Sequence, residues 1–278
     1  MIIRSDWHIH SAASYDADLS LEEIAEGAER FGYAKIGITD HANLNDASFL
    51  GDLRTSVKNV TDFQKTHSNI ILGVELTPIE KPQFDYIKKH GVTDGYCAPH
   101  SSEPFEIELA QTKEELQALG VRYAIGAAHW RIDVPNGRGL APELSACIKE
   151  WYRQQMWLAQ DERVTVLGHP WYHGKGLWYE DFSVIPRSMN QDIAAVLKEN
   201  GKYVECNSQF FFSKYSTERF RHQYADFLRE LFEMGIPVTY GSDAHLRYDQ
   251  DPAHIEGYLR SSGFSDGDFS ELSERGLW

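Results

Sequence analysis

The sequence is short of the features that mark disulfide-stabilised or membrane-spanning proteins. It has three cysteines, Cys97, Cys147 and Cys206, and no C-x-x-C pair, which argues against a disulfide framework and a thiolate zinc site. We expect all three to be small buried residues. No apolar run approaches the ~20 residues needed to cross a bilayer, and the N-terminus lacks the basic-then-apolar layout of a signal peptide. We therefore expect a cytoplasmic protein with no membrane partner.

Positive charge is also scarce. The chain has 27 Lys and Arg against 42 Asp and Glu, a formal net charge of -15, which repels a polyanion such as DNA at long range. No basic stretch offsets this, so nucleic acid is not the expected partner. Internal repeats, low-complexity tracts and Pro- or Gly-rich linkers are absent as well, and we expect residues 1–278 to form one domain.

Short apolar runs alternate with longer amphipathic stretches, a pattern typical of a β/α fold with a mostly parallel sheet. Seven strands are predicted, at residues 2–3, 34–38, 70–74, 123–127, 164–167, 203–206 and 237–240. Apolar residues recur every three or four positions between them, which predicts helices at residues 21–31, 52–65, 142–159, 190–200 and 217–234.

Polar side chains, most of them able to bind metals, follow the predicted strands. In chain order they are His8 and His10, His41, Glu75, His129, His169, Asn207, Asp243 and His245. In a barrel of parallel strands the C-terminal strand ends converge on one face, so these residues would meet in one site. Core packing does not require such an arrangement. Imidazole and carboxylate ligands without thiolate suit Zn, Mn or Fe, and the pattern therefore predicts a metal centre.

Each of these residues has an ordinary structural interpretation when it is considered alone. A His-x-His pair arises by chance, and a single strand-end histidine is commonly a hydrogen-bonded structural residue. Glu75 could be a solvated glutamate just past its strand, and Asn207 a buried structural amide rather than a donor facing the site. Asp6 could orient His8 or His10 from behind. The metal interpretation rests on the whole set, because independent structural roles would have to coincide at strand after strand.

The same residues carry a family resemblance. The chain has Asp-x-His-x-His at residues 6–10, Gly-Ile-Thr-Asp-His at 37–41, Gly-His-Pro at 168–170, Glu-x-Asn at 205–207 and Gly-Ser-Asp-Ala-His at 241–245. In this order, with Glu75 and His129 between them, these motifs resemble the polymerase and histidinol phosphatase (PHP) family. The resemblance implies a distorted (β/α)7 barrel, similar to a TIM barrel, with a di- or trinuclear metal centre at the C-terminal strand ends.

The resemblance also implies two adjacent ions that share Glu75. The first ion would be held by Glu75 with His8, His10 and Asp243. The second would be held by Glu75 with His129 and His169. His100 is an alternative to His129, which we prefer because it directly follows a predicted strand.

His41 and His245 would hold a third ion. In several phosphatases of the family a histidine six residues after the His-x-His pair completes that site, whereas here the position is Asp16, which keeps a possible ligand but changes its charge and reach. We therefore expect two or three divalent ions, with Zn, Mn and Fe all compatible with these ligands.

Such a centre indicates a metal-dependent hydrolase, most simply a phosphatase of a small phosphomonoester. Two adjacent cations can bind phosphate oxygens and activate a water, so no protein nucleophile is required. Histidinol-phosphate-like and nucleotide-like substrates are both compatible. The alternative is a hydrolase of amides or lactones on the same centre, as in the amidohydrolases. A nuclease is disfavoured by the net charge, and a non-catalytic relic would be expected to lose ligands.

Three residues are predicted to act directly in the reaction: Asp243 as acceptor of the water proton, Glu75 as the bridging carboxylate, and Arg131, two residues after His129, as the phosphate-binding cation. Asp40 could hold a ligand histidine. Alternatives to Arg131 are Arg219, Arg221 and Arg247. Aromatic residues near the strand ends are expected to line the pocket, among them Trp7, Trp130, Trp171 and Tyr172.

Overall fold

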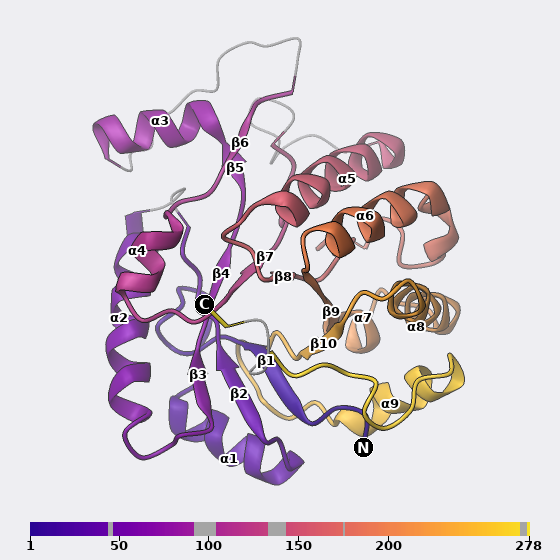
Figure 1. The fold of residues 1–278 in the computed structure, drawn as a ribbon, viewed down its shortest axis with the longest axis horizontal. Helices are drawn as coiled ribbons and strands as arrows, with labels where there is room; N and C mark the ends of the chain where they lie inside the picture. Colours follow the sequence, from indigo (N-terminus) through magenta and orange to yellow (C-terminus); the bar gives the residue numbers. More distant parts are fainter. Residues whose placement is uncertain (44–46, 92–103, 133–142, 175, 273–276) are drawn as a thin grey trace.

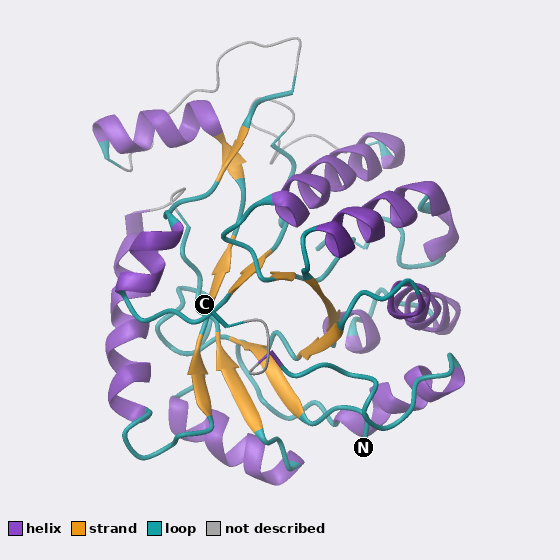
Figure 2. Cartoon of the chain, in the orientation of Figure 1, coloured by secondary structure: helices purple, strands orange, loops and turns teal. Residues whose placement is uncertain are grey.

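The computed structural model describes residues 1–43, 47–91, 104–132, 143–174, 176–272 and 277–278. Its parallel strands are β1 (Ser5–Ile9), β2 (Lys35–Ile38), β3 (Ile70–Leu72), β4 (Val74–Leu76), β7 (Ala124–Gly126), β8 (Val166–Leu167), β9 (Tyr203–Asn207) and β10 (Val238–Gly241). They form two sheets with the orders β1-β2-β3 and β10-β9-β8-β7-β4. Together the sheets form a ring, with most helices around its outside (Figures 1 and 2).

The two sheets are joined at two places. β3 and β4 are separated only by Gly73, and β3 pairs with β2 while β4 pairs with β7. On the other side, the Asp243 amide donates to the His8 carbonyl at 2.7 Å, and the His10 amide donates to the Ala244 carbonyl at 3.0 Å. With β3 and β4 counted as one, the described residues provide seven strand positions, so the predicted distorted barrel is confirmed.

Helices connect successive strands outside the ring. Those predicted from the sequence are α1 (Leu21–Phe31), α2 (Ala47–Phe63), α5 (Leu144–Gln160), α6 (Arg187–Glu199) and α8 (Glu218–Glu233). Pro142, where one helix was predicted to begin, lies outside the described residues. The bounds of α1 follow from its caps, because Ser20 and Glu23 form a capping box and Gly32 ends the helix at φ 73°.

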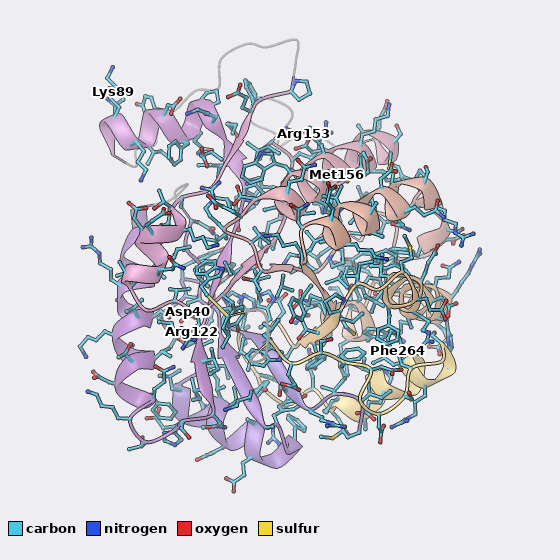
Figure 3. All side chains as sticks on the ribbon, viewed as in Figure 1. Asp40, Lys89, Arg122, Arg153, Met156 and Phe264 are labelled. Atoms are coloured by element: carbon cyan, nitrogen blue, oxygen red, sulfur yellow. The ribbon has the colours of Figure 1, made fainter. Side chains whose placement is uncertain are left out.

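Shorter elements were not predicted. They are α3 (Lys81–His90), α4 (Lys113–Ala118), α7 (Gln209–Phe212), α9 (Pro252–Ser261), the 3-10 helix η1 (Phe182–Val184), and the antiparallel pair β5 (Ile79–Glu80) and β6 (Ile107–Glu108). α3, β5 and β6 stand apart from the ring, and Lys89 on α3 points away from the rest of the molecule (Figures 1 and 3).

The predicted first strand at residues 2–3 is wrong. Ile2 and Ile3 are buried, but their amides donate to the Glu256 carboxylate at 2.7 and 3.0 Å instead of to a neighbouring strand. The strand is β1, whose five residues are all buried although three of them are polar. An apolar pattern cannot reveal such a strand, because its polar side chains are paired inside the molecule.

Aromatic and aliphatic side chains close the ring below the C-terminal strand ends. Trp7, Tyr123, Ile125, Val166 and Tyr203 form one buried cluster. The C-terminal segment packs against it through Leu272, which is fully buried, and the Trp278 amide donates to the Arg122 carbonyl at 2.7 Å, so that the C-terminus lies near the point where β3 and β4 meet in Figure 1. The interior of the ring is therefore a packed core with no open channel through this cluster.

Two further predictions concern cysteines and membranes. Cys147 and Cys206 are buried and free, as predicted, whereas Cys97 lies outside the described residues. Among the described residues, no helix is both long and apolar enough to cross a bilayer.

Candidate metal centre

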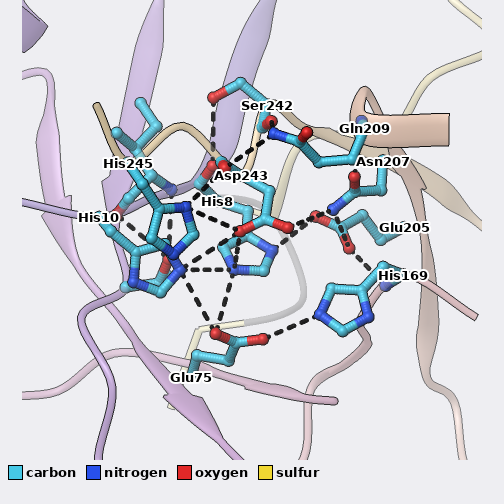
Figure 4. A network of polar contacts seen from close by, with 12 residues as sticks. His8, His10, Glu75, His169, Glu205, Asn207, Gln209, Ser242, Asp243 and His245 are labelled. Atoms are coloured by element: carbon cyan, nitrogen blue, oxygen red, sulfur yellow. Dashed lines mark hydrogen bonds and ion pairs between the residues drawn. The ribbon is translucent and has the colours of Figure 1, made fainter. Parts of the chain in front are cut away.

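Histidine and carboxylate side chains from distant parts of the chain converge at the C-terminal ends of the strands (Figure 4). His8 lies on β1, Glu75 on β4, and the others follow the ends of β1, β2, β7, β8 and β10. The structure brings together all the predicted ligands, namely His8, His10, Asp16, His41, Glu75, His129, His169, Asp243 and His245. His100, the alternative to His129, lies outside the described residues.

Glu75 is at the centre of the cluster. Its Oε2 lies 3.5 Å from His8 Nε2, 3.3 Å from His10 Nε2 and 3.0 Å from His41 Nδ1. Its Oε1 lies 3.0 Å from His169 Nε2 and 3.3 Å from His129 Nε2. The two oxygens thus face different sets of imidazoles, which is the arrangement of a carboxylate that bridges two cations.

Ligand atoms within reach of a common ion form three groups in the described residues: His8, His10 and Asp243; Glu75, His129 and His169; and His10, His41 and His245. The first two groups match the two adjacent sites that the family resemblance implies. In the third group His10 accompanies the two expected histidines, so its ring lies between two candidate positions.

The donor set fits a divalent metal. Glu75 Oε2 is buried and makes no hydrogen bond, although three imidazole nitrogens surround it. His8 Nε2 and His10 Nε2 face each other at 3.1 Å inside fully buried side chains. Two nitrogen lone pairs at this distance repel each other unless a proton or a cation lies between them. A metal ion would satisfy both nitrogens and the carboxylate oxygen at once.

The cluster attracts positive charge. Burial alone would lower the pKa of His8, but the carboxylates of Glu205, Asp243 and Glu75 outweigh it and raise that pKa well above its ordinary value. For His41, the effect of burial is likewise outweighed, chiefly by Glu75 and then by Asp16, and the pKa rises to about 10. The carboxylates therefore favour positive charge between these side chains, and a divalent ion supplies more charge than a single proton does.

Asp16 lies at the more exposed edge of the cluster. Its Oδ2 is 3.5 Å from His41 Nε2 and 3.6 Å from His245 Nε2, separations suitable for ligands of one ion. The side chain of Asp16 is 32% exposed and that of His245 is 26% exposed, whereas that of His8 is fully buried. An ion at this third position would therefore have more access to water than an ion beside Glu75.

Side chains behind the ligands hold the imidazole rings. Thr77 Oγ1 contacts His129 Nδ1 at 3.0 Å, and Ser14 Oγ contacts His10 Nδ1 at 3.3 Å while donating to Asp40. Asp40 thus supports a ligand histidine through Ser14, close to the role predicted for it. Asp6 instead accepts backbone amides, including that of His8 at 3.2 Å, so it holds the strand and not a ring.

Glu205 is the main residue to which sequence analysis assigned no role. Its Oε1 lies 2.7 Å from His8 Nδ1, and its Oε2 accepts the His169 amide at 2.5 Å. Asn207 donates to Glu205 and to Asp243, each at 3.2 Å, so it faces the site as a donor. The sequence signal was a charged residue within the apolar run of β9, because a carboxylate there must be paired.

Two ligands have left-handed backbone conformations. His169 has φ 23° and Asp243 has φ 53°, and Trp171 nearby has φ 67°. Non-glycine residues adopt such angles at a cost of about 1–3 kcal/mol, and they are found where the surrounding structure holds them. This strain lies directly at the strand ends that carry ligands, as expected for a functional site.

A cavity of about 590 Å³ lies beside the cluster. It is lined by Tyr172, Gln209, Asp243, His245 and Arg247, among others. Arg247 therefore shares a cavity with two candidate ligands. Arg219 and Arg221 pair instead with Asp181 and Glu218.

The other residues predicted around the pocket have different positions. Trp7 and Trp171 are buried in the core and do not line this cavity, whereas Tyr172 does. Trp130 is half-buried and its ring lies 5.8 Å from that of His129. Arg131 is half-buried just after it, and its role in phosphate binding stays a prediction.

Comparisons with known proteins agree with this fold. A histidinol phosphate phosphatase of Lactococcus lactis, solved with zinc, L-histidinol and phosphate, has a TM-score of 0.70 at 16% identity, covering 96% of both chains. A Listeria monocytogenes protein assigned as a histidinol phosphatase has a TM-score of 0.61 at 15% identity, covering 87% of this chain and 95% of its own. No curated protein sequence gives a significant match. The PHP domain family model matches residues 6–209, which is more than half of the sequence, and the chain belongs to the PHP domain family.

Proposed function

We propose that the protein is a metal-dependent phosphatase of a small phosphomonoester and that the converging histidines and carboxylates hold its ions. The structurally similar Lactococcus lactis protein was solved with zinc, histidinol and phosphate, which supports zinc and a small phosphorylated compound as first choices. Mn and Fe fit the same ligand types. The size of the cavity suits a small organic group beside the phosphate.

The position of Glu75 carries this proposal. A single buried carboxylate presents one oxygen to three imidazoles and the other to two more. Two cations held on the two oxygens would be adjacent. Adjacent cations lower the pKa of a shared water and neutralise the charge that builds up on a phosphoryl group.

The chain's own residues supply the rest of the chemistry. Asp243 is the proposed acceptor of the proton from the attacking water, because its carboxylate borders both the ligand cluster and the cavity. Asn207 orients this carboxylate by donating to its Oδ2. Arg247 or Arg131 would hold the phosphate, and Tyr172 and Gln209 border the space for the organic group.

The proposal is tested by phosphate release from a panel of phosphomonoesters that includes histidinol phosphate and nucleoside monophosphates. The protein is reconstituted with Zn or Mn, and metal content is measured on the same samples. We expect hydrolysis of at least one phosphomonoester by the wild type. In Glu75→Gln, activity should fall by more than about 100-fold, because the bridge between the two ions is lost.

The panel also separates the phosphatase from its alternative. A wild type that retains its metals but releases no phosphate from any member would contradict the phosphatase proposal. Hydrolysis of amide or lactone substrates by that same sample would then identify the amidohydrolase-like activity. A wild type that binds no metal would contradict both.

A further inference from the structure

Glu205 joins residues of two different metal positions. One oxygen lies 2.7 Å from the His8 ring, whose other nitrogen faces His10, and the second oxygen accepts the backbone amide of His169. His8 belongs to the group with His10 and Asp243, whereas His169 belongs to the group with Glu75 and His129. Figure 4 shows Glu205 between these ligands and on the side away from Glu75.

The contact with His8 fixes which ring nitrogen is available. Glu205 Oε1 is an acceptor, so a neutral His8 donates from Nδ1 and carries its lone pair at Nε2. That nitrogen points toward His10, Glu75 and Asp243. The contact therefore sets both the tautomer and the direction of the ring.

The contact with His169 acts on the backbone. His169 has φ 23°, a conformation that costs energy in a non-glycine residue, and Glu205 accepts its amide at 2.5 Å. Its ring nitrogen Nε2 lies 3.0 Å from Glu75 Oε1. Holding the amide thus holds the imidazole against the bridging carboxylate.

Asn207 extends the same network to a third ligand. Its Oδ1 accepts the Gln209 amide at 2.8 Å, which fixes the orientation of the side-chain amide. Its Nδ2 then donates one hydrogen to Glu205 and the other to Asp243. Glu205, Asn207, His8 and His169 are all buried, with exposed fractions of 2% or less.

We propose that Glu205 is a positioning residue that sets the metal affinity of two adjacent positions at once, through the ring of His8 and the backbone of His169. The proposal rests on the metal centre described above. It goes beyond it by assigning to one residue outside the ligand set the control of both positions.

The test measures zinc affinity position by position in Glu205→Gln, using competition with a chromophoric chelator and metal analysis of the bound protein. The glutamine keeps the shape of the side chain but loses the negative charge that both contacts share, and its NH2 group replaces one of the two acceptor oxygens that face the His8 ring and the His169 amide. We expect the dissociation constants of two zinc ions to rise by about 10- to 100-fold each.

Two other variants make the result specific. Thr77 contacts only one ligand ring, that of His129, so Thr77→Ala should weaken a single zinc ion. Glu256→Gln is the matched control, because Glu256 also accepts two backbone amides but at Ile2 and Ile3, outside the ligand set. It should lower the melting temperature and leave both zinc affinities at the wild-type level.

A measurement on the wild type covers the case in which Glu205→Gln does not fold. In zinc-loaded protein labelled with ¹⁵N-histidine, His8 should be protonated at Nδ1 and bound to zinc at Nε2. The reverse tautomer would overturn the proposal, as would wild-type affinity at either zinc in folded Glu205→Gln, or equal losses in Glu256→Gln. A wild type that binds no zinc would contradict the metal centre itself and, with it, this proposal.

Discussion

Arg247 is an exposed side chain, and its place beside the cavity links it to the candidate site. It lies two residues after His245 and lines the cavity that borders Asp243. Arg219 and Arg221, which looked equivalent in the sequence, form ion pairs on α8 and its surroundings. A guanidinium beside the cavity can bind a phosphate by two parallel hydrogen bonds, which makes Arg247 the leading candidate among these three.

Replacing Arg247 with alanine should therefore raise KM for the phosphorylated substrate by about 10-fold, the loss expected for one charge-assisted contact, with a smaller change in kcat. Steady-state kinetics on the best substrate of the panel provide the measurement. Arg219→Ala is the control and should keep the wild-type KM. An unchanged KM in Arg247→Ala together with a raised KM in Arg131→Ala would return the role to Arg131.

At the scale of secondary-structure elements, the close approach of β1, β9 and β10 requires a residue without a side chain at Gly241. A Cβ atom at Gly241 would lie 2.6 Å from the His8 Cβ and would overlap the Glu205 carboxylate. The neighbouring strands therefore leave no space for a side chain here. The absence of a Cβ lets the Glu205 carboxylate reach His8 across the end of β10.

Gly241→Ala should consequently destabilise the protein by about 1–3 kcal/mol and reduce its zinc content. Gly257 is a matched control, because it lies within α9 and a Cβ there meets no atom within 4 Å. Gly257→Ala should be neutral or stabilise by up to about 1 kcal/mol. Urea unfolding of both variants measures the difference, and equal stabilities would show that the space around Gly241 is not limiting.

The elements differ in how far the sequence reveals them. Strands such as β2 and long helices such as α8 carry clear apolar periodicity, and both were predicted. β1 was misplaced because its polar residues are buried and paired, and periodicity assumes that polar residues face water. α4 and β5 are six and two residues long, too short for a pattern to be distinguished.

The candidate site was easier to predict than the elements around it. Ligand types such as His8 and Asp243 stand out at strand ends, and the barrel topology alone brings them together. Glu205 could not be assigned, because nothing in the sequence tells which buried carboxylate holds a ligand and which one bridges cations. That distinction depends on side-chain directions across three strands, which only the folded structure provides.

At the scale of the whole molecule, ions at the candidate centre would hold different strands of the ring together. The candidate ligands come from β1, from β4 and from the ends of four other strands, so ions bound by them would connect segments that are far apart in the sequence. Ions that bind the folded chain and not the unfolded chain add about 2.7 kcal/mol per site at a free concentration 100 times the dissociation constant. Metal binding should therefore contribute a large part of the net stability.

Removing the metals with a chelator should lower the melting temperature by about 5–10 °C for each ion lost under those conditions. Differential scanning calorimetry with and without zinc measures the shift. Glu75→Gln serves as the comparison, because its melting temperature should respond much less to the chelator. A wild type whose melting temperature is unchanged after complete metal removal would contradict the structural role of the ions.

The closure of the ring between β1 and β10 has a consequence for synthesis on the ribosome. His8 and His10 emerge from the ribosome some 230 residues before Asp243 and His245. β1 also lacks one neighbour until the segment after β10 arrives, since the His10 amide bonds to Ala244. A nascent chain without this segment therefore lacks Asp243 and His245, so loading of the first and third candidate positions would wait for β10, whereas Glu75, His129 and His169 of the second are already present.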